Sequence, residues 1–199
     1  MPASLSRRRS DRAEVRLRRV LLVLNGAPGV GKSALAYRYA REHPLALVVE
    51  IDELRRRLGQ WRDVEESKVV ARDLAVALTR AHLRTGHDVV IPQYLGRRGF
   101  VERLAEVAAD ADTLLVEVIL TDDDGRIIER FRRRRTQLQS NGLQHPEGDL
   151  ADDQIASEIR SANQLLRSRA LAHGLPVIDA GSGLEAAHNA LRETLACIS

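Results

Sequence analysis

The residues best suited to chemistry form one short run, Gly26-Ala27-Pro28-Gly29-Val30-Gly31-Lys32-Ser33. Glycines at this spacing let backbone N–H groups converge on an anion with no Cβ in the way. The lysine that follows them adds a flexible positive charge, and the serine hydroxyl at the next position is suited to ligate Mg²⁺. The pattern therefore predicts a loop that cradles the phosphates of a nucleotide.

The segments on either side of this run agree with that prediction. Residues 20–24 are an unbroken apolar stretch, which is typical of a strand buried on both faces of a parallel sheet. Residues 33–42 predict a helix, whose N-terminus favours a bound anion. We expect Lys32 to reach the β and γ phosphates and Ser33 to hold the metal. The expected nucleotide-binding residues of this region are Gly26, Pro28, Gly29, Val30, Gly31, Lys32, Ser33 and Ala34.

Asp52 is the candidate catalytic base. It follows the second predicted strand, 46–51, and opens a short helix that continues through Leu58. A carboxylate at the end of the strand beside the phosphate loop faces the crevice, where it can accept the proton of an attacking hydroxyl or hold Mg²⁺ through water. An N-cap for the short helix is the alternative interpretation, and the two roles are compatible.

Arginines recur at every fourth position of a predicted helix over 122–135. Arg126, Arg130 and Arg134 share one face of this helix. Such a stripe can neutralise charge on a transferred phosphoryl group, and the alternative is a solvated surface. Which arginine contacts phosphate stays open, because neighbouring positions are also arginine.

The acidic run Asp122-Asp123-Asp124, followed by Gly125, imitates a switch motif of GTP-binding proteins. It stands at a predicted helix start, where acidic residues are ordinary caps. The chain has only two lysines, Lys32 and Lys68, and no guanine-reading motif surrounds Lys68. We therefore interpret the run as capping.

Gln93 and Tyr94 follow the third predicted strand, 88–92, at a place where a standard Walker B site would have an acidic residue. An amide and a phenol at this position can hydrogen-bond a polar acceptor molecule. Arg55, almost one helical turn after Asp52, is a further candidate for contact with the acceptor, as are the neighbouring arginines and Arg72.

Five predicted strands alternate with helices, which indicates an α/β fold with three layers, α/β/α, around a parallel sheet. Residues 136–150 contain turn formers and no apolar period, so we interpret them as a mobile lid. The predicted organisation is a basic, disordered tail over 1–19 and one domain over 20–199. The remaining predicted helices are 64–85, 97–109, 152–173 and 184–198, and the remaining strands are 113–120 and 176–178.

The net charge of +3 comes from the first 19 residues, which hold seven arginines, one aspartate and one glutamate. That segment is therefore at +5 and the remainder at −2, so no domain-wide basic footprint exists and nucleic acid is not an expected partner. The single cysteine, Cys197, excludes an intrachain disulfide and fits a reducing cytoplasm. No apolar run reaches the length of about 20 residues that a membrane span needs.

Over residues 20–198 the chain resembles P-loop kinases of the small phosphotransferase type. The matching residues are the loop 26–33, Asp52, the segment Glu129-Arg130-Phe131-x-x-Arg134 and the run Val177-Ile178-Asp179-Ala180-Gly181. Within that group the chain is similar to chloramphenicol phosphotransferase, zeta-toxin and tunicamycin-resistance-like kinases. The resemblance implies a strand order of 2-3-1-4-5, ATP with Mg²⁺, and γ-phosphoryl transfer to a hydroxyl. It also implies Asp52 as the base, Arg130 and Arg134 as charge clamps, and Asp179 and Gly181 near the adenine.

The leading hypothesis is an ATP-dependent phosphotransferase that acts on a hydroxyl of a small polar metabolite or antibiotic. A kinase of nucleoside or polynucleotide 5′-hydroxyls is an alternative, for which the basic tail would supply electrostatic attraction. A second alternative is a regulator that binds ATP without transferring its phosphoryl group. The acceptor, the choice between ATP and GTP, and the oligomeric state stay open.

Overall fold

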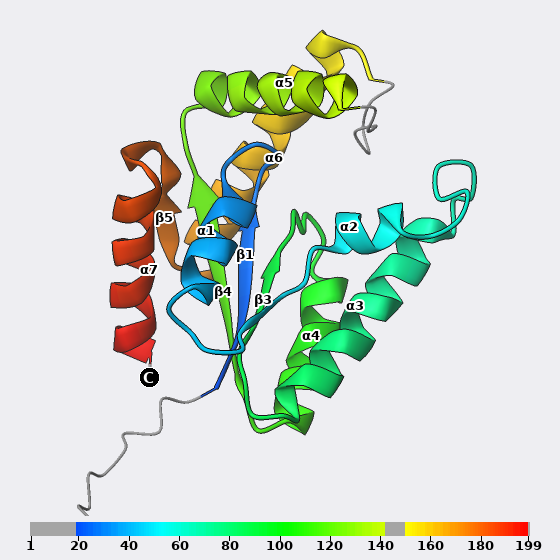
Figure 1. Ribbon diagram of the computed structural model, residues 1–199. Coiled ribbons are helices and arrows are strands. Elements are labelled where there is room, and N and C mark those ends of the chain that lie inside the picture. Colours follow the sequence, from blue (N-terminus) through cyan, green and yellow to red (C-terminus); the bar gives the residue numbers. More distant parts are fainter. Residues whose placement is uncertain (1–18, 142–149, 199) are drawn as a thin grey trace, which may run out of the picture.

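A single five-stranded parallel sheet organises the chain in the computed structural model, which describes residues 19–141 and 150–198 (Figure 1). The strand order is β2-β3-β1-β4-β5, and every neighbouring pair is parallel. The predicted α/β fold class and the order 2-3-1-4-5 are therefore confirmed. The strands are β1 (Val20–Gly26), β2 (Leu47–Val48), β3 (Val89–Pro92), β4 (Leu114–Thr121) and β5 (Val177–Asp179).

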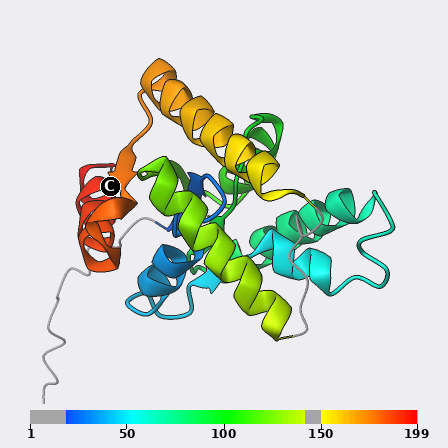
Figure 2. The same cartoon turned by 90° about the horizontal axis from the view of Figure 1, so that it is seen from above.

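Helices cover both faces of this sheet (Figure 1), and one helix crosses above the carboxyl ends of its strands when the molecule is seen from above (Figure 2). Helices α1 and α7 lie on one face, α3 and α4 lie on the other, and α5 is the helix that crosses. The bounds are α1 (Lys32–Ala40), α2 (Ile51–Arg56), α3 (Ser67–Leu83), α4 (Gly99–Asp110), α5 (Asp124–Ser140), α6 (Asp152–His173) and α7 (Leu184–Ile198), with a 3-10 turn, η1 (Ala180–Ser182).

The central strand β1 is buried on both faces, which explains its unbroken apolar sequence. Leu22 and Leu24 belong to the core formed with α1, α5 and α7, whereas Leu21 and Val23 belong to the core formed with α3 and α4. Burial of one such side chain stabilises the fold by roughly 1.5–3 kcal/mol. These contacts fix the carboxyl end of β1, and with it the loop that follows.

Several element boundaries differ from the sequence predictions, among them those of β2 and α5. Strand β2 spans two residues where 46–51 was expected, because the chain leaves the edge of the sheet and enters α2 at Ile51. Helix α5 continues to Ser140 where an end at Arg135 was expected, since no glycine or proline interrupts residues 136–140. The first five residues of the predicted lid are therefore helical.

Parts of two sequence predictions lie outside the described residues. These parts are residues 1–18 of the predicted tail and residues 142–149 of the predicted lid. The division into tail, domain and lid stays a prediction. Among the described helices, none has both the length and the apolar character that crossing a membrane requires.

Candidate functional site

The glycine-rich loop connects β1 to α1 and adopts a backbone that requires glycine. Gly29 and Gly31 have φ values of 90° and 112°, which other residues rarely adopt. A Cβ on Gly29 would lie 2.7 Å from the carbonyl oxygen of Ile127 on α5. The loop can therefore pass directly beneath α5 only because position 29 has no side chain.

Lys32 folds back over this loop. Its Nζ donates hydrogen bonds to the carbonyl oxygens of Gly26, at 2.9 Å, and Ala27, at 3.0 Å. The N-cap of α1 is Gly31, so no side chain caps the first N–H groups of this helix. An ammonium and uncapped helix N–H groups at one place form a suitable setting for an anion.

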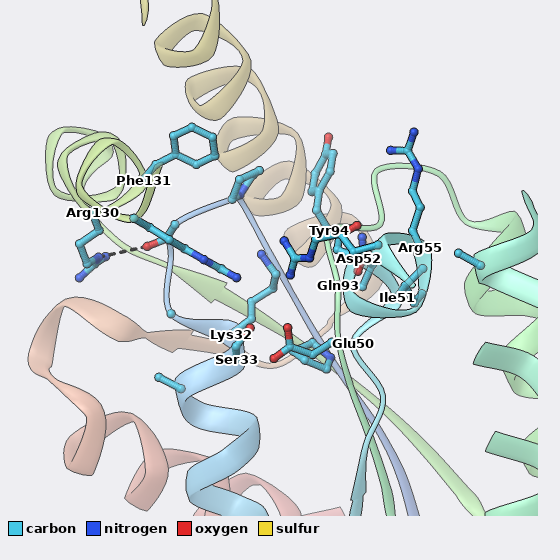
Figure 3. A pocket seen from close by; sticks show the side chains of 18 of the residues that line it. Lys32, Ser33, Glu50, Ile51, Asp52, Arg55, Gln93, Tyr94, Arg130 and Phe131 are labelled. Atoms are coloured by element: carbon cyan, nitrogen blue, oxygen red, sulfur yellow. Dashed lines mark hydrogen bonds between the residues drawn. The ribbon is translucent and has the colours of Figure 1, made fainter. Parts of the chain in front are cut away.

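A cavity of about 720 Å³ opens beside the loop and α1, within the usual size of a small-molecule site, about 300–1,000 Å³ (Figure 3). It brings together residues from the loop, α2, the end of β3 and α5. Most of the site residues predicted from the sequence line this cavity: Pro28, Gly29, Gly31, Lys32, Ser33, Ala34, Asp52, Arg55, Gln93, Tyr94, Arg130 and Arg134.

Gly26 and Val30, both predicted to bind nucleotide, do not line the cavity. Val30 is buried in the core beneath the loop. A Cβ on Gly26 would lie 2.7 Å from a methyl group of Val30 and 2.9 Å from the carbonyl oxygen of Leu120. These two residues therefore pack closely within the loop, and their packing fixes the shape of the loop segment that lines the cavity.

Asp179 and Gly181, implied to lie near an adenine, also stand outside this cavity. Asp179 accepts hydrogen bonds from the Gly181 N–H, at 2.8 Å, and from the Ser182 hydroxyl, at 3.0 Å, and so closes the turn η1. Gly181 packs directly against Asp122 and Arg126. The turn therefore adjoins the start of α5, and an adenine site there stays a prediction.

Two carboxylates reach the cavity from α2 and its start. Asp52 lies in the first turn of α2, while the N-cap position is Glu50, so Asp52 is not the cap that was the alternative interpretation. Both residues line the cavity together with Ser33, and Figure 3 shows Glu50 beside Lys32 and Ser33. Glu50 was not among the site residues predicted from the sequence, although a charged residue within an otherwise apolar run was a signal that it has a role.

Tyr37 on α1 lies near two carboxylates at the start of α2, Glu50 and Glu53. Burial, followed by the charges of Glu50 and Glu53, raises the pKa of Tyr37, and the phenol hydrogen-bonds to Glu50. The phenol of Tyr37 is therefore a neutral hydrogen-bond donor that orients the Glu50 side chain.

Gln93 and Tyr94 line the cavity as predicted. The backbone N–H of Gln93 donates to the Leu24 carbonyl at 3.1 Å, which ties the residue to β1. The Tyr94 hydroxyl lies over Gly96, where a Cβ would be 2.7 Å away. Burial raises the pKa of Tyr94, so its phenol is a neutral hydrogen-bonding group at neutral pH.

A buried polar network holds the segment after β3 against the end of β1. Asn25 donates to the Leu95 carbonyl at 3.1 Å and to Glu117 Oε1 at 2.9 Å, and it accepts from the Leu95 N–H at 2.9 Å. Arg169 of α6 donates to the Leu95 carbonyl at 2.9 Å and to Glu117 Oε2 at 2.7 Å. This network fixes the position from which Gln93 and Tyr94 reach the cavity.

A second buried carboxylate, Asp122 at the end of β4, organises the arginine stripe. Arg126 Nε donates to Asp122 Oδ1 at 2.8 Å, and Arg130 forms an ion pair with Asp122 Oδ2. Arg130 Nε also donates to the Gly29 carbonyl at 3.1 Å, which joins α5 to the loop. Arg130 and Arg134 line the cavity, whereas Arg126 is turned toward Asp122 and η1.

The acidic run 122–124 was predicted to cap a helix, which is confirmed for Asp123 and incomplete for Asp122. Asp123 is the N-cap of α5 and accepts from the Arg126 N–H at 3.1 Å. Asp122 instead has a fully buried side chain that pairs with two arginines. Burial by itself would raise the pKa of Asp122, but hydrogen bonds from Arg126, Arg130 and the Asp123 N–H outweigh it and lower that pKa.

The sheet order, the glycine-rich loop and the cavity beside it define a P-loop protein with the fold of the P-loop kinases. Residues 21–156 match the family model described as an AAA domain. This match covers more than half of the chain, so the chain belongs to that family. No curated protein matches the chain significantly in sequence.

Several solved structures have a similar fold. A provisionally assigned kinase from Chloroflexus aurantiacus is 17% identical with a TM-score of 0.59, over 88% of this chain and 98% of that one. The tunicamycin resistance protein of Deinococcus radiodurans is 17% identical with a TM-score of 0.52, over 90% and 94% of the two chains. A chain of the Pnkp1/Rnl/Hen1 RNA repair complex is 16% identical with a TM-score of 0.59, over 76% of this chain and 46% of that one.

Proposed function

We propose that this protein is an ATP-dependent phosphotransferase that moves the γ-phosphoryl group of ATP to a hydroxyl of a small polar metabolite or antibiotic. One observation carries the proposal: a single cavity is lined by Lys32 and Ser33 of the loop, by Asp52 of α2, and by Arg130 and Arg134 of α5. A phosphate cradle, a candidate base and a pair of cations are the groups that phosphoryl transfer needs at one place.

The transfer step assigns a role to each group. The acceptor hydroxyl oxygen attacks the γ-phosphorus, the bond from that phosphorus to the β–γ bridging oxygen breaks, and ADP leaves. Asp52 takes the proton of the hydroxyl as its oxygen attacks. Lys32 and the arginines stabilise the negative charge that is spread over the transferred group. Gln93 and Tyr94 hydrogen-bond the acceptor and orient it.

The oxygen donors of the cavity fit Mg²⁺. The Ser33 hydroxyl and the carboxylates of Glu50 and Asp52 all line it, and hard oxygen ligands are those that Mg²⁺ prefers. Glu50 thereby offers the acidic group that is missing after β3, where Gln93 stands. When bound, Mg²⁺ would neutralise charge on the β and γ phosphates.

The proposal is tested by incubating the purified protein with γ-labelled ATP, Mg²⁺ and a panel of hydroxylated compounds that includes 5′-hydroxyl oligonucleotides. We expect label in one small-molecule class, and none with Lys32→Met protein purified in parallel, which excludes a contaminating kinase. Label in oligonucleotides alone would favour a 5′-hydroxyl kinase. ATP binding with no transfer to any acceptor would favour a regulator and would contradict the proposal.

A further inference from the structure

The half of the cavity formed by α2 and α3 contains two arginines that form no direct ion pair with a carboxylate among the described residues. Four cations line this half: Arg55, Arg56, Lys68 and Arg72. Arg56 forms an ion pair with Glu53, and Lys68 forms one with Glu65 at 2.9 Å. In the part of the chain that the structure describes, no carboxylate forms an ion pair with Arg55 or Arg72.

Neutral groups hold Arg55 in place. Its Nε donates to the Ser67 hydroxyl oxygen at 2.9 Å, and a terminal nitrogen donates to the Trp61 carbonyl at 3.3 Å. The guanidinium carbon also lies 5.0 Å from the centre of the Trp61 ring. These contacts orient the guanidinium without cancelling its charge, so a planar cation is already positioned at the wall of the cavity.

Arg72 shares the contact with an aromatic ring: its guanidinium carbon lies 6.0 Å from the centre of the Phe100 ring. It lies one turn of α3 beyond Lys68, which also lines the cavity. Two arginines on two adjacent helices therefore border the same half of the cavity, and both are oriented by aromatic rings.

The phosphates of ATP do not account for these two arginines. The loop end of the cavity has its own cations in Lys32, Arg130 and Arg134. Arg55 follows Asp52 by three residues on α2, and Figure 3 shows both on the side of Lys32 that is opposite Arg130. Arg55 therefore lies with the candidate base, at the end of the cavity where an acceptor would sit.

We propose that the acceptor carries an anionic group, a phosphate, sulfate or carboxylate, in addition to the hydroxyl that is phosphorylated, and that Arg55 and Arg72 bind this group. The inference rests on the proposed function and narrows its acceptor to anionic molecules. A guanidinium matches a two-oxygen anion with two parallel hydrogen bonds, which supplies both affinity and orientation. The bound anion would hold the molecule with its hydroxyl toward Asp52.

Acceptors offered in matched pairs test this inference: glycerol with glycerol 3-phosphate, ribose with ribose 5-phosphate, and a nucleoside with its 3′-monophosphate. The anionic member of the labelled pair should have a kcat/KM higher by about 10- to 100-fold, the effect of one or two charge-assisted hydrogen bonds. With ATP at a saturating concentration, inorganic sulfate should inhibit competitively against the acceptor.

Variants separate anion binding from a structural role. Arg55→Gln and Arg72→Gln should each raise the KM for the anionic acceptor about 10-fold or more and leave the KM for ATP and the melting temperature nearly unchanged. Arg55→Lys should recover only part of the loss, because an ammonium lacks the planar fork. Arg57→Gln is the matched control, since Arg57 is exposed on the same helix end and does not line the cavity.

The outcomes also separate this inference from the proposed function. Transfer to neutral members alone, or an unchanged acceptor KM in both arginine variants, would overturn the inference and leave the phosphotransferase proposal standing. If no compound is labelled, ³¹P NMR of inorganic phosphate with protein saturated by a non-hydrolysable ATP analogue decides the matter. Binding that is lost in Arg55→Gln protein would support the anion site, and absent or unaltered binding would overturn it.

Discussion

Arg130 joins the phosphate loop to a buried acid: it forms an ion pair with Asp122, whose side chain is 0% exposed, and it donates a hydrogen bond to the Gly29 carbonyl. The guanidinium is thereby held at the cavity before any ligand enters. A catalytic cation that is fixed in advance loses little conformational entropy when charge develops beside it. Asp122 thus acts through Arg130, as a positioning residue.

Asp122→Asn should destabilise the protein by about 2 kcal/mol. Removing one partner of a buried ion pair costs about 3–5 kcal/mol, and the half-exposed arginines recover part of this in water. The native pKa of Asp122 lies below its ordinary value of 3.8, so its stabilising contribution is present above pH 3.8 and is lost as the pH falls further. Urea unfolding at pH 7 and pH 3 measures both effects.

Asp123→Asn is the matched control for this experiment. Asp123 is exposed and its role is the N-cap of α5, which asparagine fills equally well. We expect a change within about 0.5 kcal/mol for the control. Equal losses in both variants would contradict the positioning role of Asp122.

Lys32→Met should weaken ATP binding about 10- to 100-fold with little change in melting temperature. The variant removes the charge that lies over the loop, and one charge-assisted contact to phosphate accounts for a factor of this size. Lys32→Arg should also bind poorly, because a planar guanidinium does not replace a compact ammonium here. Isothermal titration with Mg·ATP measures the affinities, and Arg133→Met, at an exposed position, is the control. Wild-type affinity in Lys32→Met protein would show that the lysine does not contact the nucleotide.

Arg169→Met should cost about 3 kcal/mol of stability, because it leaves Glu117 charged and buried without its partner. Glu117→Gln keeps an oxygen that can accept from Asn25, so the double variant should be more stable than Arg169→Met alone. Denaturant unfolding of the four proteins gives the coupling energy. Additive losses would mean that Arg169 and Glu117 do not act as a pair.

His188 should make the fold less stable as the pH falls below 6.5. Its side chain is buried, with Nε2 3.5 Å from Glu42 Oε2, and burial lowers its pKa below the ordinary 6.5. As the pH falls, the unfolded chain binds a proton at His188 before the native state does. The free energy of unfolding therefore has its full value above pH 6.5 and declines as the pH falls toward the native pKa of His188, by at most about 1.4 kcal/mol per pH unit. Unfolding between pH 8 and pH 5.5 should show this slope in wild type and a smaller slope in His188→Leu; identical slopes would refute the assignment.

The sequence predicted the fold well because its main signals are local. The apolar run of β1 specifies a buried strand, and the glycine spacing of residues 26–31 specifies the backbone of the loop that follows it. The cavity lies beside this loop. The four-residue spacing also predicted a shared helix face for the arginines, and Arg130 and Arg134 both line the cavity.

Long-range polar contacts were the part that the sequence did not reveal. Asp122 resembled an ordinary helix cap, yet its side chain is buried and forms ion pairs with Arg126 and Arg130 of α5. Asn25 directly precedes the glycine-rich loop in the sequence, yet it is buried and donates a hydrogen bond to Glu117, 92 positions away. A polar residue within an otherwise apolar strand, as at Asn25 in β1 and Glu117 in β4, was the available signal for such contacts.

The proposed chemistry is tested most directly by measuring γ-phosphoryl transfer and ATP affinity side by side in wild-type, Asp52→Asn and Asp63→Asn proteins. Asp63 is exposed and does not line the cavity, so it is the matched control. If Asp52 takes the proton of the acceptor, Asp52→Asn lowers the transfer rate about 10²- to 10⁴-fold while ATP affinity stays near wild type, and Asp63→Asn changes neither. Transfer at the wild-type rate by Asp52→Asn protein would contradict the account.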